Sequence, residues 1–409
     1  MDTGARHCSE NWRLWWRKHA MQEAEQQADL TLRHFDRVES LEESWRCLEA
    51  APECSIHQTY DWCRCWIEKT NARPLLITGE FASGPQRGKT AFILPLCVEK
   101  TGPLRIARYI GAAYNNINFG VFSQEFMNGI DAARMRKIWK DIAAMPLDVD
   151  LFMLDRQPRQ WRGMPHPIAC LATVENQNHA FQVTLDCAFE DVLARGNAKR
   201  RRKKFRTSER RLEEWGGYEY VTATGAEDAQ SLLDTFFRQK AARFEVQGIP
   251  DVFEDTKIKS FFHRLTKDSI DQQRKMIELC AIRLKKDGTI CAISALSRKD
   301  GHVICQFSSI ATGELEAASS GELLFYLMIR SACEEKAEIF DFGIGDEQYK
   351  RSWCDVETVH FDAVLPVTAK GYLGAVGARW LIDSKRFLKS NKKIFALAKA
   401  VRIRLKQKR

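Results

Sequence analysis

Apolar positions in the second half of the chain follow strand and helix periods in turn. Residues 218–222 alternate like a strand, and helical patterns follow at 226–245 and 255–270. Asp-Gly pairs at 287–288 and 300–301 predict turns between three further strands, at 276–284, 289–297 and 303–310. The half ends with a helix at 320–336, a strand at 338–342, a short helix at 346–353 and a strand at 358–364.

The first half repeats this order of elements. The predicted strands are 30–35, 74–81, 91–99, 104–110 and 150–154, and the predicted helices are 41–50, 57–69 and 131–145. A repeat this long indicates two related domains, because solenoid repeats have periods of about 20–50 residues.

These patterns divide the chain into five segments. We expect a flexible N-terminal segment at 1–29, an α/β domain at 30–195, a basic linker helix at 196–215, a second α/β domain at 216–366 and a basic amphipathic tail at 367–409. Each domain is predicted to hold a mixed, mostly antiparallel sheet flanked by helices.

The net charge of +9 is concentrated near the C-terminal end. Residues 385–409 carry 11 Lys/Arg and no acid, whereas the remainder carries 52 basic and 54 acidic side chains. The body is therefore close to neutral, and the basic isoelectric point does not indicate nucleic-acid binding by it.

Cysteine usage and the apolar runs favour the cytoplasm. The 13 cysteines include no C-x-x-C pair and no Cys/His cluster at zinc spacing, so we expect reduced thiols and no metal. No apolar run approaches about 18 residues, so no transmembrane helix is predicted. Trp12, Trp15 and Trp16 lie among basic residues, unlike the apolar core of a signal peptide.

The sharpest local feature is a strand end followed by a small-residue turn and an apolar helix. The strand is 306–310, and the helix begins near Ser319, Ser320 and Gly321. The first turn of a helix has unpaired N–H groups that hold anions, and glycine permits a close approach to the backbone. A capped core helix is the alternative interpretation.

Two neighbouring features favour an anion site. A short apolar strand at 339–343 holds the single carboxylate Asp341, and a short helix carrying Tyr349 follows it. Strand, anion-binding helix, strand and tyrosine-bearing helix is the order of elements in GNAT acyltransferases.

The chain resembles GNAT acyltransferases of the CelD/BcsL type, which are associated with cellulose and other exopolysaccharide synthesis. The resemblance covers about residues 35–365. It is carried by RRRKKFRTSERRLEEWGG (200–217), SSGELLFYLMIRSACEEKAEIFDFGIGDEQYKRSW (319–353), HQTYDWCRCWIEK (57–69) and FILPL (92–96). The family usually has proline where this chain has Ser320.

The resemblance implies tandem GNAT-like domains and an acetyl-CoA or longer acyl-CoA co-substrate. In that fold the fourth and fifth strands separate, the pantetheine arm enters the gap, and the pyrophosphate lies on the following helix. The positions that match the coenzyme site are Phe307, Ser308, Ser309, Ser319, Ser320, Gly321, Glu322 and Leu323.

Two residues are candidates for catalysis. Tyr349 lies where GNAT enzymes often place a tyrosine near the thioester sulfur; the alternative is a packed aromatic side chain. Asp341 is either the base for the acceptor, or a carboxylate that pairs with Lys350 or an arginine and organises the site. Asp346 and Glu347 are alternative bases.

The two basic segments leave alternatives open. The run 199–204 is either a solvated helix face or a site for an anionic acceptor, a membrane or nucleic acid, the last being disfavoured because no binding motif accompanies it. The tail at 385–409 either lies on anionic lipid at the inner membrane face or packs across the domains.

Three functions compete. The first is acyl transfer from acyl-CoA to an amine or hydroxyl of a small-molecule or saccharide acceptor. The second is aminoacyl transfer of the FemAB type from aminoacyl-tRNA, whose characteristic long helical hairpin the sequence does not predict. The third is a non-catalytic accessory protein of a polysaccharide synthase. The N-terminal domain lacks a counterpart of the Ser320-Gly321 turn, so we expect it to have lost coenzyme binding and to help form the acceptor groove.

Overall fold

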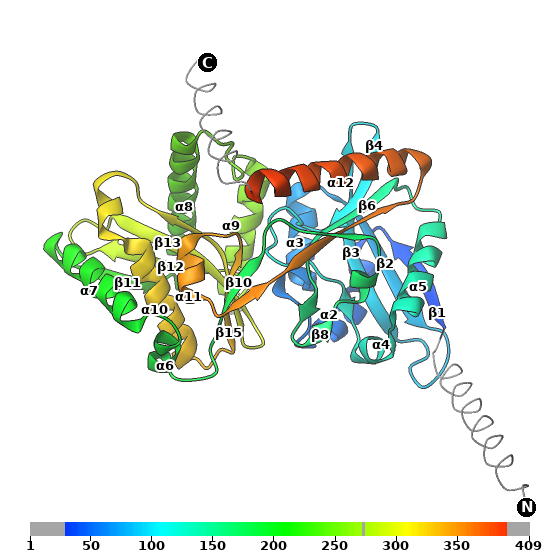
Figure 1. Cartoon of the computed structure of the whole chain (residues 1–409), viewed down its shortest axis with the longest axis horizontal. Coiled ribbons are helices and arrows are strands. Elements are labelled where there is room, and N and C mark those ends of the chain that lie inside the picture. Colours follow the sequence, from blue (N-terminus) through cyan, green and yellow to red (C-terminus); the bar gives the residue numbers. More distant parts are fainter. Residues whose placement is uncertain (1–28, 272–274, 391–409) are drawn as a thin grey trace, which may run out of the picture.

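Two mixed sheets, each flanked by helices, lie side by side in the computed structural model (Figure 1). The structure describes residues 29–271 and 275–390. The predicted segment up to residue 28 and the part of the basic tail from residue 391 onward lie outside these residues. No described helix is long and apolar enough to cross a membrane.

The first sheet has the strand order β1-β2-β3-β4-β6-β17-β9, and β5 pairs with β3. All its pairs are antiparallel except β4 with β6. Its strands are β1 (Leu30–Phe35), β2 (Arg73–Phe81), β3 (Thr90–Thr101), β4 (Leu104–Tyr109), β5 (Val121–Phe122), β6 (Leu151–Pro158), β9 (Thr173–Glu175) and β17 (His360–Pro366). A separate ribbon pairs β7 (Gln160–Trp161) with β8 (Met164–Pro165).

The second sheet has the order β11-β12-β13-β14-β15-β10-β16. It is antiparallel throughout except for β14 with β15. Its strands are β10 (Ala180–Thr184), β11 (Tyr218–Thr222), β12 (Glu278–Leu284), β13 (Ile290–Lys299), β14 (His302–Ile310), β15 (Ile339–Ile344) and β16 (Val356–Thr358).

The helices cover both faces of the sheets. Those of the first half are α2 (Glu42–Glu49), α3 (Tyr60–Thr70), α4 (Gln124–Gly129) and α5 (Ala132–Ala144), with short 3₁₀ turns at Val38–Leu41, Ile56–Gln58 and Pro167–Cys170. The second half contains α6 (Phe189–Ala194), α7 (Ala198–Glu214), α8 (Ala226–Gln247), α9 (Thr256–Asp271), the 3₁₀ turn η4 (Gly313–Ala318), α10 (Ser320–Glu334), α11 (Gln348–Trp353) and α12 (Ala369–Ser390).

The two sheets exchange strands. β10 precedes the basic helix in sequence but pairs with β15 and β16 of the second sheet. β17 is the last strand of the predicted second domain but pairs with β6 and β9 of the first sheet. The sequence boundaries at 195 and 366 therefore do not coincide with the limits of the sheets, because strand pairing over a long separation places these two segments.

One apolar core extends across both domains. Trp62 and Trp66 of α3 contact the ring of Phe261 on α9, at centroid distances of 5.6 and 4.9 Å. Both helices contribute to the same cluster of buried side chains. Burial of large aromatic side chains across the boundary fixes the relative position of the domains.

The predicted basic linker corresponds to α7, which packs on the second domain. Phe205 stacks on Tyr326 of α10 at 4.2 Å, and Leu212 is fully buried. Arg201 lies over the ring of Trp353 at 4.4 Å and donates to the carbonyl oxygens of Val192 and Leu193. The run 199–204 is therefore not uniformly solvated.

Candidate active site

The parallel strands β14 and β15 separate partway along their length. Their pairing ends at Ile304 and Asp341. β14 continues to Ile310 while pairing only with β13, and β15 continues to Ile344 while pairing with β10. Since every second residue of an antiparallel strand directs its amide and carbonyl away from its partner, the end of β14 presents unpaired backbone groups to the gap.

A bulge marks the point where the strands part. Gln306 is the extra residue, because Phe307 faces Ala295 and Cys305 faces Leu296. The Gln306 side chain donates to Ser297 Oγ at 2.9 Å, and its Oε1 lies 2.9 Å from His57 Nε2. The bulge therefore joins the second sheet to the first domain.

Asn116 of the first domain occupies the closed end of the gap. Its Nδ2 lies 3.4 Å from the carbonyl oxygens of both Cys305 and Gln306. On the other strand, a Cβ at Gly343 would lie 2.4 Å from Asn116 Oδ1. Glycine at 343, which also has a φ of +68°, is thus required for Asn116 to fit between the strands.

The start of α10 lies beside the open end of the gap. Ser319 adopts a left-handed conformation with a φ of 55°, and Ser320 Oγ donates to the carbonyl of Cys291 at 3.1 Å. A Cβ at Gly321 would lie 2.9 Å from Ile310 Cγ2, so the helix start and the end of β14 approach closely. In this first turn the amides of Glu322 and Leu323 bond to the carbonyl oxygen of Ser319, at 3.0 and 3.4 Å, whereas the amides of Ser320 and Gly321 have no backbone acceptor among the described residues.

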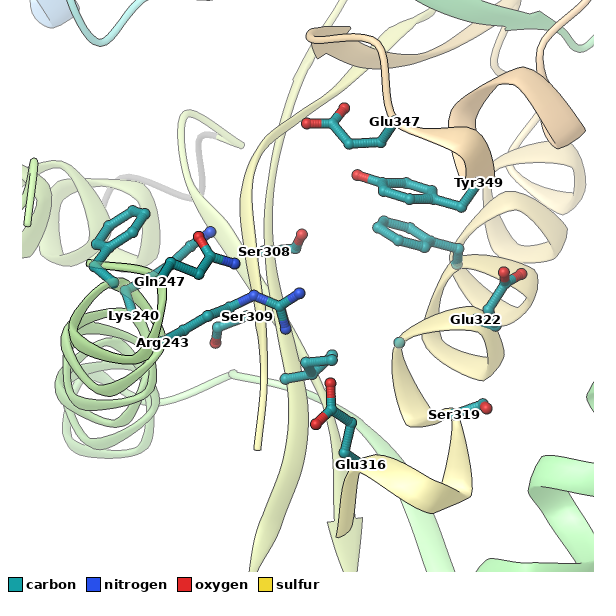
Figure 2. Close-up of a pocket in the computed structure, with 14 residues that line it drawn as sticks. Lys240, Arg243, Gln247, Ser308, Ser309, Glu316, Ser319, Glu322, Glu347 and Tyr349 are labelled. Atoms are coloured by element: carbon teal, nitrogen blue, oxygen red, sulfur yellow. The ribbon is translucent and has the colours of Figure 1, made fainter. Parts of the chain in front are cut away.

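A cavity of about 530 Å³ lies between β14, α8, α10 and α11. Figure 2 shows Lys240, Arg243 and Gln247 from α8 on one side and Glu322 and Tyr349 on the other, with the strand between them. Its lining consists of Lys240, Arg243, Phe244, Gln247, Ser308, Ser309, Ile310, Glu316, Ser319, Gly321, Glu322, Phe325, Glu347 and Tyr349.

Six of the ten positions predicted from the sequence line this cavity: Ser308, Ser309, Ser319, Gly321, Glu322 and Tyr349. The side chains of Phe307, Ser320, Leu323 and Asp341 lie outside it. Phe307 stacks on Phe236 of α8 at 4.2 Å, and Leu323 is fully buried in the second core cluster. Phe307 therefore packs beneath α8 and Leu323 beneath α10, and neither side chain reaches the cavity.

Sequence reasoning missed the basic wall of the cavity. Lys240, Arg243 and Gln247 are spaced three and four residues apart, so they share one face of α8. Burial and the nearby charge of Arg243 lower the pKa of Lys240. The sequence does contain a feature that indicates this wall: the last turns of α8 carry the polar stripe, whereas its earlier turns carry the buried side chains Leu232, Leu233, Phe236 and Phe237.

The acidic side chains of the cavity are mostly neutralised. Lys204 of α7 pairs with Glu322 at 2.6 Å, and Lys350 pairs with Glu347 at 3.0 Å. Arg243 forms no ion pair with the described residues and faces the same space. With these two lysines included, four basic side chains (Lys204, Lys240, Arg243 and Lys350) face three carboxylates (Glu316, Glu322 and Glu347), which is an excess of one basic group.

Tyr349 is held by aromatic packing at the edge of the cavity. Its ring stacks on Phe325 with centroids 5.1 Å apart and an interplanar angle of 10°, and contacts Phe342 edge-on. Burial, followed by the charges of neighbouring groups, raises the pKa of Tyr349 above its usual value. The phenol therefore stays protonated and points into the cavity as a donor (Figure 2).

Asp341 is fully buried where β14 and β15 part. Its carboxylate lies 3.2 Å from His302 Nε2 and accepts from Gln182 Nε2 at 2.8 Å and from the amide of Gly343 at 2.6 Å. Burial alone would raise the pKa of Asp341, but these donors lower it below its usual value. Its partners are thus His302 and Gln182 rather than Lys350 or an arginine.

The first domain has a similar pair of parallel strands, but its gap is filled. β4 and β6 pair only at Ile106–Leu151 and Ala107–Phe152. Beyond this point Asn118 donates to the carbonyl of Asp155 at 3.0 Å, and its own amide bonds to Arg156. The loop that follows β4 thus occupies the position that is open between β14 and β15.

The described residues contain no group of three or more His, Cys, Asp or Glu side chains arranged to hold a metal ion. The reactive groups around the cavity are backbone amides, a phenol, two basic side chains and three carboxylates, of which Glu322 and Glu347 are in ion pairs.

Residues 199–351 match the family model of the acetyltransferase (GNAT) domain. The match begins in α7 and ends in α11, so it contains the separated strands, the start of α10 and Tyr349. This region is therefore similar to GNAT acetyltransferases in sequence as well as in its order of elements. No curated protein matches the sequence.

Solved structures share the fold over most of the chain. A crystal structure of FemX has a TM-score of 0.56 and 13% identity, covering 82% of this chain and 97% of that one. A conserved protein of unknown function from Bacteroides thetaiotaomicron VPI-5482 has a TM-score of 0.50 and 12% identity, covering 82% and 100%. The predicted fold class, two GNAT-like domains with mixed sheets flanked by helices, is confirmed.

Proposed function

We propose that this protein transfers an acyl group from an acyl-CoA thioester to an amine or hydroxyl acceptor. The observation that carries this proposal is the cavity between the unpaired edge of β14, the start of α10 and the basic face of α8. A thioester arm needs an extended row of backbone groups, and a diphosphate needs free amides and cations. The cavity offers both within one space.

The diphosphate binds at the first turn of α10 in this proposal. Amides at the start of a helix, reinforced by its dipole, attract phosphate groups. Arg243 and Lys240 face this turn from α8 and add positive charge (Figure 2). The pantetheine arm then lies along Ser308 and Ser309, and the acyl group points toward the closed end at Asn116.

The reaction joins the acceptor to the carbonyl carbon and breaks the carbon–sulfur bond. Unpaired amides of β14 stabilise the negative charge on the carbonyl oxygen. The raised pKa of Tyr349 opposes complete proton transfer, so its hydroxyl stabilises the leaving thiolate by donating a hydrogen bond. Glu347 lines the cavity and takes the acceptor proton, whereas Asp341 positions the two strands.

The resemblance to CelD/BcsL-type proteins favours a sugar or an exopolysaccharide precursor as acceptor. The acceptor reaches the thioester from the side of the first domain, which contributes Asn116 and His57 near the gap. In the first domain the corresponding gap between β4 and β6 is filled by the loop that contains Asn118. This supports coenzyme binding by the second domain alone.

Aminoacyl transfer is the second candidate, because the fold is shared with FemX. The polar end of the gap, formed by Asn116 and Gln306, also suits a polar acyl group. Against it, the longest described helices have 22 residues and neither forms a long inserted hairpin. A non-catalytic accessory role would leave the cavity without a function.

Calorimetric titration with acetyl-CoA and longer acyl-CoAs tests the proposal. We expect micromolar binding by the wild type, and none by Gly321→Trp, because that side chain fills the cavity next to Ile310. Gly225→Trp is the matched control, since a Cβ at this position meets no atom within 4 Å and the site lies outside the cavity lining. Absence of acyl-CoA binding by the wild type, with transfer from aminoacyl-tRNA, would establish the second candidate instead.

A further inference from the structure

One face of α12 is apolar and largely exposed. The opposite face packs on the first sheet, where Ala375 is 5% exposed and contacts Leu151 and Val364. Outward-facing side chains are between 53% and 77% exposed: Tyr372, Leu373, Val376, Trp380, Leu381 and Phe387. The described residues include just three other exposed large apolar side chains, and these are scattered over different elements. Apolar side chains gathered in this way mark an interaction surface.

The spacing of these side chains makes them a single stripe. Tyr372, Val376 and Trp380 follow one another at four-residue intervals, and Leu373, Trp380 and Phe387 at seven-residue intervals. Residues so spaced lie on one side of a helix. The stripe spans about four turns, which is enough to contact an extended surface along its whole length.

The protein holds α12 in place with this face outward. Asp150 accepts a hydrogen bond from Thr368 Oγ1 at 3.0 Å and pairs with Lys370 at 3.1 Å. Gly371 packs so closely on Asp150 that a Cβ would lie 1.8 Å from its carbonyl oxygen. Figure 1 shows α12 lying along the outside of the first domain. The exposed stripe is therefore a fixed feature of the molecular surface.

The stripe adjoins the most basic part of the chain. α12 contains one acid, Asp383, together with Lys370, Arg379, Lys385, Arg386 and Lys389. The sequence from 391 to 409 adds eight Lys/Arg and no acid. Because the remainder of the protein is close to neutral, the sequence from α12 to residue 409 carries nearly the whole charge excess.

We propose that α12 docks the protein on an anionic lipid bilayer. Trp380 and Tyr372 are side chains that favour the membrane interface, and the aliphatic side chains enter the region just below the head groups. The adjoining lysines and arginines bind the negative head groups. α12 lies parallel to the bilayer surface and remains packed on the sheet.

Charge complementarity favours lipid over the other occupants. A second copy of this face would bring two strongly basic segments together. Residues 1–28 carry four acidic and four basic side chains and so have no net charge to offer the basic segment. An anionic bilayer matches both the apolar stripe and the charge.

Co-sedimentation of the full chain with vesicles tests this docking surface. The vesicles contain phosphatidylglycerol and phosphatidylcholine in equal parts, or phosphatidylcholine alone. We expect the triple variant Tyr372→Ser, Val376→Ser, Trp380→Ser to bind the anionic vesicles at least about tenfold more weakly than the wild type. The wild type is expected to bind the neutral vesicles about tenfold more weakly than the anionic ones.

The control variant is Val246→Ser with Val356→Ser, which removes exposed apolar side chains outside α12. It is expected to bind anionic vesicles like the wild type, and all variants are expected to melt at the same temperature, because the replaced side chains are exposed. Equal vesicle binding by the wild type and the triple variant would overturn the proposal. A second result would also overturn it: a wild type that is dimeric and a triple variant that is monomeric in sedimentation without lipid. That result would show that the stripe binds a second copy of the chain.

Discussion

His57 Nε2 lies 2.9 Å from Oε1 of Gln306, although 249 residues separate them in sequence. Ser55 Oγ accepts a hydrogen bond from the backbone amide of His57 and lies 3.1 Å from Nδ1 of the same histidine. Ser55 therefore donates its proton to Nδ1, and Nε2–H donates to Gln306. A neutral imidazole in this tautomer joins the first domain to the bulge of β14.

Protonation of His57 is expected to weaken the folded protein. Burial lowers the pKa of His57 to about 4, whereas an unfolded histidine has a pKa of about 6.5. Between these values the unfolded chain binds a proton that the folded protein does not. Stability present above about pH 6.5 is therefore lost as the pH falls toward 4, by up to about 1.4 kcal/mol per pH unit for each such histidine.

Urea unfolding at about pH 7 and about pH 5 measures this dependence. We expect His57→Gln to lose less stability than the wild type between these two pH values, because glutamine keeps a donor for Gln306 and does not titrate. The exposed His34, changed to glutamine, is expected to leave the dependence unchanged. Burial also lowers the pKa values of His166 and His360, so these two histidines account for the pH dependence of stability that remains in His57→Gln. If stability depends on pH in His57→Gln as it does in the wild type, the titration of His57 does not contribute to that dependence.

Asn116 is expected to limit the length of the acyl group. Its side chain fills the closed end of the gap between Gln306 and Gly343. Asn116→Ala removes three heavy atoms there, so the ratio of kcat/KM for butyryl-CoA to that for acetyl-CoA is expected to rise about tenfold. Asn128→Ala, on the exposed end of α4, serves as the control. A ratio unchanged from the wild type would place the acyl group elsewhere.

Arg243 is expected to bind the phosphates of the donor. It faces the cavity beside the start of α10 and forms no ion pair with a described residue, so its guanidinium can bind an anion. Arg243→Ala is expected to weaken acyl-CoA binding about tenfold and to reduce the effect of added salt on that binding. Arg238→Ala removes an exposed arginine of the same helix, which contacts Thr235, and is expected to bind like the wild type. Calorimetry at two salt concentrations distinguishes the two variants.

Tyr349 is expected to act on the leaving group through its hydroxyl. Tyr349→Phe keeps the stacking on Phe325, so stability and donor binding are expected to stay near those of the wild type. The value of kcat is expected to fall about a hundredfold, because the thiolate loses its donor. Tyr326→Phe removes a hydroxyl on the far side of α10 and is expected to retain activity. Wild-type kcat in Tyr349→Phe would mean that the ring only packs.

Parts of the site could be predicted because they depend on local sequence. The end of β14, the turn at Ser319 and the start of α10 are contiguous, and helix capping and periodicity act over a few residues. A buried carboxylate at Asp341 was predictable for the same reason, as it interrupts an apolar strand. Its need for partners followed from the cost of burying a charge.

The identity of those partners was not predictable. His302 on β14 and Gln182 on β10 reach Asp341 because these two strands flank β15. β10 precedes the second domain in sequence but pairs within the second sheet. The same pairing over long separations places β17 in the first sheet and brings Asn116 and His57 to the gap. Periodicity does not reveal which distant strands will be neighbours.

By itself, the sequence determined the order of elements, the two-domain repeat, the helix start at Ser320 and the basic C-terminal end. These depend on the spacing of apolar residues, on turn residues and on charge, which are properties of short segments. Only the tertiary structure decided which strands pair, which side of α8 faces the cavity and which face of α12 stays uncovered. Those outcomes depend on burying one continuous core across both domains, and no single segment encodes that packing.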